Sequence, residues 1–182
     1  MPTSADDRAR KRVTRAERDV RMANRAAHAL GASHSGDPES WRRARGRGWS
    51  AAETLRHLAL TASSVVEQLR VVAAQGALTR PSARSVGQAT RLRFALTTWR
   101  LPENLGVLPA TDPGGVVMTA TDLEQAHVAW TASFVGLLHE HTPAFLTNVR
   151  SAHPNYGDMD PIEWARFLRI YFRQHELRLM AR

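Results

Sequence analysis

Residues 153–164 read HPNYGDMDPIEW, and this stretch predicts a turn that leads directly into a helix. Proline and glycine favour the turn over residues 154–157. Asp160 then occupies an N-cap position, Pro161 the first helical position and Glu163 the third, which together are a typical helix start. The chain is therefore expected to have a well-defined final helix, from Pro161 to near the C-terminus.

The final helix carries an apolar face that ends in a histidine. Its members recur at helical spacing, so they lie on one side of the helix: Trp164, Phe167, Leu168, Tyr171 and His175. Such a face predicts packing against other helices. We therefore expect His175 to point into the protein.

The N-terminal segment has the same periodicity over residues 5–30. Val13, Val20 and Leu30, with small residues between them, fall on one face. Its first two turns are strongly charged, and we expect them to project into solvent or to fray. Gly31 and the polar residues after it are expected to end this helix.

A second long helix is predicted over residues 51–74. Ser50 and Glu53 form a capping-box pattern at its start, and Gly76 is a C-terminal stop signal. Its apolar stripe consists of Leu55, Leu58, Ala62, Val65, Val66, Leu69 and Val72.

A third long helix is predicted over residues 122–141, where Thr121 and Glu124 match a capping box. Its seam repeats every three or four residues, as in helical bundles: Leu123, His127, Trp130, Phe134, Leu137 and His141.

The remaining segments are less regular. A short helical turn is expected over residues 38–45 and a helix over residues 86–99, and the proline and glycine residues at 102–115 predict an irregular crossover. No segment alternates as a half-buried strand would. The predicted fold is an all-α four-helix bundle of up-down-down-up order with a long Pro/Gly-rich crossover loop. We expect one domain over residues 1–182, with residues 1–12 frayed or extended.

Composition narrows the classes of function. The sequence contains no cysteine, which excludes thiolate catalysis and cysteine-bound zinc. No apolar run is long enough for a membrane span, and the arginine-rich start is unlike a secretory signal, so a cytoplasmic protein is expected. The net charge of +8 comes almost entirely from arginine. We interpret it as solvated helix faces rather than a nucleic-acid surface, because the basic clusters lack interleaved aromatic residues.

Histidines are the candidate chemical groups. His57 lies at the edge of its apolar stripe, where it faces a groove between helices, and bundles build core metal sites from such residues. The alternative is a hydrogen-bonded core histidine, which is the interpretation favoured for His127. His153 is expected to brace its turn, and His139 and His141 to interact with a helix C-terminus.

Several short motifs resemble the DinB-like superfamily of helical bundles. They are GWS at residues 48–50, LRHL at 55–58, HPNYG at 153–157, and the pairs Glu163-Trp164 and Gln174-His175. The resemblance implies a divalent metal (zinc, nickel, iron or manganese) held by His57, Tyr171 and His175. Tyr171 stands where the family has a third histidine, and Asn155 replaces a common aromatic residue.

The resemblance implies a metal-dependent enzyme of the thiol S-transferase or hydrolase type, with a small-molecule thiol or another substrate. Tyr171 would then be a metal ligand, a hydrogen-bond donor or a general acid. The alternative hypothesis is a non-catalytic bundle that has lost the metal and serves as a ligand-binding or protein-interaction module, in the form of a homodimer. Nucleic-acid binding is a third and less favoured hypothesis.

Overall fold

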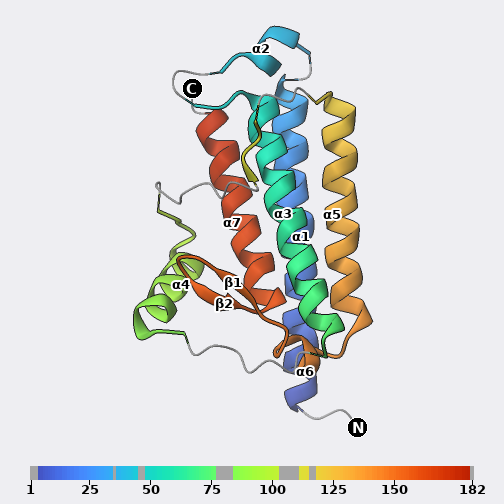
Figure 1. Ribbon diagram of the computed structural model, residues 1–182, viewed down its shortest axis with the longest axis vertical. Helices are drawn as coiled ribbons and strands as arrows, with labels where there is room; N and C mark the ends of the chain where they lie inside the picture. Colours follow the sequence, from blue (N-terminus) through green and yellow to red (C-terminus); the bar gives the residue numbers. More distant parts are fainter. Residues whose placement is uncertain are drawn as a thin grey trace.

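Four long helices pack together in one bundle (Figure 1). They are α1 (Ser4–His34), α3 (Ala51–Ala74), α5 (Ala120–Glu140) and α7 (Pro161–Met180) in the computed structural model. The structure describes residues 4–34, 36–44, 48–76, 84–102, 111–114 and 118–180. In Figure 1, α1 and α7 run upward while α3 and α5 run downward, which confirms the predicted up-down-down-up bundle.

The core lies where the apolar faces of the four helices meet. α1 packs along α7 and α5, and α3 packs along α5 and α7. The largest side chains of this core include Phe134 and Leu137 of α5 and Phe172 of α7, all completely buried. Burial of these faces stabilises helices that would be marginal alone.

Smaller elements close the ends and one side of the bundle. They are α2 (Pro38–Arg42), α4 (Val86–Thr98) and α6 (Pro143–Leu146). Two short antiparallel strands, β1 (Ser151–His153) and β2 (Gly157–Met159), flank the turn before α7, with Ser151 opposite Met159. The expectation of no strands was therefore wrong, because three-residue strands are too short to show an alternating pattern.

The helix starts show how local chemistry defines the elements. The capping boxes of Ser50 with Glu53 and of Asp160 with Glu163 are present as predicted. The predicted box of Thr121 with Glu124 is wrong, because Thr119 caps α5 and pairs with Asp122 instead. The two possible capping boxes, Thr119 with Asp122 and Thr121 with Glu124, are offset by two residues. The earlier one is used, and α5 therefore starts two residues before its predicted start.

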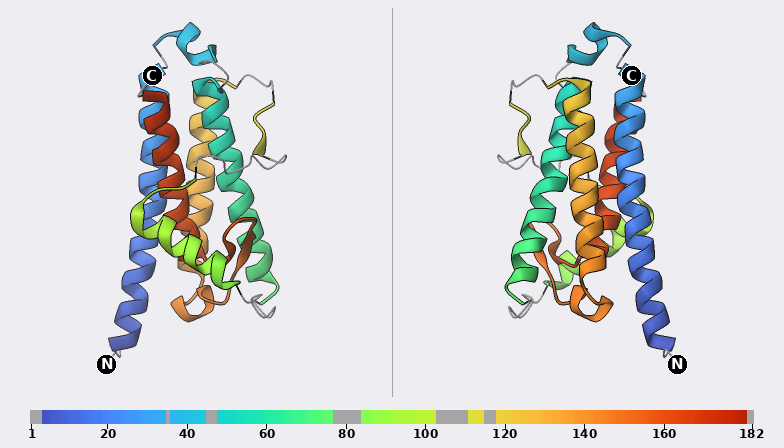
Figure 2. Two further views of the ribbon diagram at one scale, coloured as in Figure 1. Left: turned by 90° about the vertical axis from the view of Figure 1, so that its left-hand side faces the viewer. Right: turned by 90° about the vertical axis from the view of Figure 1, so that its right-hand side faces the viewer.

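α1 is longer than predicted and passes through Gly31 to His34. Its last turn is held by His34, which is buried and whose Nδ1 lies 3.0 Å from the carbonyl oxygen of Leu30. At the other end, residues 5–8 are exposed and the helix extends beyond its neighbours (Figure 2). Tertiary packing thus overrides the helix-breaking tendency of glycine.

The crossover between α3 and α5 contains α4, which lies across one side of the bundle (Figures 1 and 2). α4 follows the predicted helix closely. Most of the predicted Pro/Gly-rich loop, residues 103–110 and 115–117, lies outside the described residues. Among the described helices, none is both long enough and apolar enough to cross a membrane.

Candidate functional site

His57 lies two turns into α3 and is held by two short hydrogen bonds. Its side chain is 2% exposed. Nδ1 lies 2.6 Å from the carbonyl oxygen of Thr111, so Nδ1 must carry the proton that is donated. Nε2 lies 2.6 Å from the hydroxyl of Tyr171 and, in the neutral ring, accepts the proton of that phenol. These contacts define both the tautomer and the orientation of the imidazole.

Tyr171 and His175 lie one helical turn apart on α7, on the face that meets α3. Their ring centroids are 4.7 Å apart, and the rings of His57 and His175 are 5.7 Å apart. Tyr171 also stacks on Phe167, one turn earlier. The structure therefore brings together the three side chains selected from the sequence.

Burial keeps all three groups in their uncharged forms. Desolvation lowers the pKa of His57, and it lowers the pKa of His175 to about 3. It raises the pKa of Tyr171 to about 12. At neutral pH the cluster consists of two neutral imidazoles and a protonated phenol.

A loop and a tryptophan cover this cluster. The ring of Trp49 lies 4.6 Å from that of His57. Arg56 donates hydrogen bonds to the carbonyl oxygens of Pro113 and Gly114, which ties the loop at residues 111–114 to α3. Thr111 was not selected from the sequence, because its contribution is a backbone carbonyl and leaves no signal in the residue type.

The hydrogen bond between Tyr171 and His57 does not fit the metal site of His57, Tyr171 and His175 that the resemblance implies. A metal would need the Nε2 lone pair of His57 at about 2.0–2.1 Å, yet this lone pair accepts the proton of Tyr171. A phenol with a pKa near 12 supplies little phenolate at neutral pH. Within the described part of the chain, no group of three His, Asp, Glu or Cys side chains is arranged to hold a metal. Metal binding by His57, Tyr171 and His175 stays a prediction.

His127 belongs to a different environment on α5. Nδ1 accepts a hydrogen bond from Nε1 of Trp130 at 2.9 Å, and Nε2 donates to the carbonyl oxygen of Leu55 at 3.1 Å. Both ring nitrogens are thus used within the core, and burial lowers its pKa to about 4. This confirms the interpretation of His127 as a hydrogen-bonded core residue.

The remaining histidines stabilise local structure. Nδ1 of His153 accepts a hydrogen bond from the backbone N–H of Asn155 at 3.1 Å, which braces the turn as predicted. His139 lies 3.1 Å from a carboxylate oxygen of Glu17 near the end of α5. The ring of His141 stacks on Phe145 just beyond that end.

The comparisons agree with the bundle and its short motifs. No curated protein and no solved structure matches the chain. A family model described as the DinB superfamily matches residues 15–175, which include α3 and α5, most of α1 and α7, and the cluster of His57, Tyr171 and His175. This protein belongs to the DinB superfamily.

Proposed function

We propose that this chain is a ligand-binding member of the DinB superfamily in which the cluster of His57, Tyr171 and His175 works without a resident metal. The observation that carries the proposal is the hydrogen bond of 2.6 Å from the Tyr171 hydroxyl to Nε2 of His57. This bond satisfies the one lone pair of His57 that faces α7. The cluster is then a closed polar contact between α3 and α7, rather than an open coordination site.

The electrostatics of the cluster support the same proposal. The raised pKa of Tyr171, about 12, keeps the hydrogen on the phenol and so maintains the bond to His57. Two neutral histidines alone form a weak zinc site compared with a complete set of three protein ligands. The apolar core holds the bundle together, so the fold does not depend on a metal. The bundle can therefore serve as a binding module without one.

Metal content is the direct test. The untagged full-length protein is incubated with zinc, desalted and measured by plasma mass spectrometry, beside the double variant His57→Ala/His175→Ala. The proposal predicts far less than one ion per chain in both proteins. About one ion per chain in the wild type, lost in the double variant, would overturn it.

A second candidate, a metal-dependent thiol S-transferase or hydrolase, is favoured by two specific observations. Donation of Nδ1–H to a backbone carbonyl, as His57 makes to Thr111, is the usual support for a histidine that ligates a metal through Nε2. His175 has no hydrogen-bond partner among the described residues, and its ring faces that of His57. The positive outcome of the metal measurement supports this candidate, and thiol-transfer and hydrolase assays would then follow.

A further inference from the structure

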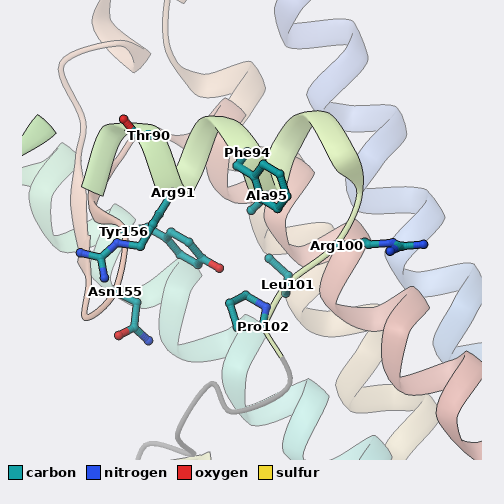
Figure 3. Close-up of a pocket in the computed structure, with 9 residues that line it drawn as sticks. All are labelled: Thr90, Arg91, Phe94, Ala95, Arg100, Leu101, Pro102, Asn155 and Tyr156. Carbon is teal, nitrogen blue, oxygen red and sulfur yellow. The ribbon is translucent and has the colours of Figure 1, made fainter. Parts of the chain in front are cut away.

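A cavity of about 520 Å³ lies between α4 and the turn that joins β1 to β2 (Figure 3). This volume is in the usual range of small-molecule sites. Apolar side chains form most of the wall, with Phe94 and Ala95 on α4, and Leu101 and Pro102 just after it. None of the three residues of the histidine–tyrosine cluster lines it.

Two clamps hold α4 in place over the cavity. Before α4, Arg84 bonds to both carboxylate oxygens of Glu163, at 2.9 and 2.5 Å. After α4, Trp99 adopts a left-handed conformation (φ 58°), with the guanidinium of Arg169 4.5 Å from the centre of its ring. Arg169 is itself bonded to the buried carboxylate of Asp19 on α1. The walls of the cavity are therefore preorganised by contacts to the bundle.

The turn approaches the start of α4 closely enough to require a glycine. Gly157 has φ of 70°, and a Cβ atom there would lie 2.9 Å from Cγ of Arg84. This close approach places the preceding residue, Tyr156, against α4.

Tyr156 supplies an unused donor at the cavity. The residue is 2% exposed, and its hydroxyl is buried with no hydrogen-bond partner in the described part of the chain. Figure 3 shows the ring directed between α4 and the segment of Leu101 and Pro102, with the hydroxyl toward that segment. A buried hydroxyl without a partner is costly, so a ligand acceptor at this position would be favourable.

The cavity also has a cationic side chain at its edge. Arg91 lines it beside Tyr156 and Asn155 (Figure 3). Its Nε donates to the carbonyl oxygen of Gly87, but no described carboxylate forms an ion pair with it. In Figure 3 the guanidinium of Arg100 points away from Tyr156, and the exposed side chain of Arg91 lies beside the ring of Tyr156, on the side away from its hydroxyl.

We infer that this cavity binds a small amphipathic anion, in which a carboxylate or sulfonate group is attached to an apolar aromatic body. The body lies against Phe94, Ala95 and Leu101, and the hydroxyl of Tyr156 donates to the anionic head. The exposed side chain of Arg91 turns across the cavity edge to contact the same head. This inference goes beyond the binding function proposed above, because the cavity is separate from the cluster of His57, Tyr171 and His175. The two are tested separately, because metal content is measured on His57 and His175 and ligand affinity on α4 and the turn.

Two fluorescent probes with nearly the same aromatic body test the inference. 8-Anilino-1-naphthalenesulfonate carries the anion, and N-phenyl-1-naphthylamine lacks it. Both are titrated into the full-length protein, before and after treatment with EDTA. We expect one saturable site for the sulfonate, tighter than for the neutral probe, and unchanged by EDTA.

Variants locate the contacts. Arg91→Gln is expected to weaken the sulfonate about tenfold, which is typical of losing one charge-assisted hydrogen bond, and to leave the neutral probe unchanged. Arg93→Gln, on the same helix but not in the cavity wall, is the matched control for net charge. Phe94→Ala removes an exposed side chain, 63% accessible, and should weaken both probes without unfolding the protein.

Tyr156→Phe keeps the aromatic ring and removes only the hydroxyl. It should weaken the sulfonate several-fold and leave the neutral probe unchanged, which separates a head-group contact from a change in packing. Equal sulfonate affinity in the wild type, Arg91→Gln and Tyr156→Phe would overturn the inference. So would equal losses in Arg91→Gln and Arg93→Gln, because binding would then follow net charge alone.

Discussion

Two histidines of this bundle have opposite surroundings. His127 on α5 uses both ring nitrogens, one with Trp130 and one with the carbonyl of Leu55. His175 on α7 is partly exposed and has no hydrogen-bond partner among the described residues, and desolvation lowers its pKa to about 3. Buried polar groups such as those of His127 are normally hydrogen-bonded, whereas a partly exposed ring like that of His175 is under no such constraint. The comparison therefore separates His127, whose hydrogen bonds stabilise the core, from His175, whose ring nitrogens remain available to a ligand.

The two tyrosines of the sequence repeat this contrast. The hydroxyl of Tyr171 donates to His57 at 2.6 Å, whereas that of Tyr156 is buried without a partner. The hydrogen-bonded side chains of His127 and Tyr171 contribute to the stability of the folded bundle. The hydroxyl of Tyr156, which is buried without a partner, and the partly exposed ring of His175 mark the places where a ligand could form new contacts.

The largest expected effect concerns the histidines. His127→Ala should lower the free energy of unfolding by about 3 kcal/mol, because it leaves a cavity and strands the partners Trp130 and Leu55. His175→Ala should cost about 1 kcal/mol or less, because it breaks no hydrogen bond within the described chain. Urea unfolding followed by circular dichroism measures both. Equal losses would remove the distinction between the two residues.

The next effect is a pH dependence. The folded pKa of His127 is about 4, below the ordinary value of 6.5, so below pH 6.5 the unfolded chain takes up a proton that the folded protein refuses. This contribution is fully present at neutral pH and is lost as the pH falls toward 4, at about 1.4 kcal/mol per pH unit.

His127→Gln isolates this contribution. The glutamine amide can accept from Trp130 and donate to the carbonyl of Leu55, but it does not titrate in this range. Between pH 7 and 4, the free energy of unfolding should therefore depend less steeply on pH in the variant than in the wild type. Parallel dependences would show that His127 is not the buried neutral group described.

The smallest effect compares the tyrosines. Tyr171→Phe should lower the free energy of unfolding by about 1 kcal/mol, because it leaves Nε2 of His57 without its donor. Tyr156→Phe should leave it unchanged or raise it by up to about 1 kcal/mol, because the hydroxyl that is removed has no partner. The same unfolding measurement at neutral pH tests the pair, and a larger loss at Tyr156 would contradict the contrast.

Much of the fold was predictable because it depends on local chemistry. The helical periodicity and the capping residues Ser50 and Asp160 located the bundle helices and their starts. The start of α5 was misplaced because Thr119 and Thr121 offer overlapping capping boxes. The end of α1 was misplaced because packing carries the helix through Gly31.

The site was predictable only in part. His57 and His175 were identifiable from their places on helix faces and from the family resemblance. Their partners were not, since the contact to Thr111 is a backbone carbonyl from a distant loop. The cavity beside Tyr156 depends on the clamps at Arg84 and Trp99, which link residues far apart in the sequence.

The most direct test of the central claim is the zinc content of Tyr171→His, measured by plasma mass spectrometry beside the wild type and Tyr171→Phe. The substitution replaces the phenol that occupies the lone pair of His57 with the imidazole that the family motif has at this position. We predict about one zinc ion per chain in Tyr171→His and far less than one in the other two proteins. One zinc ion per chain in the wild type, or none in Tyr171→His, would contradict the claim that Tyr171 takes the place of the metal.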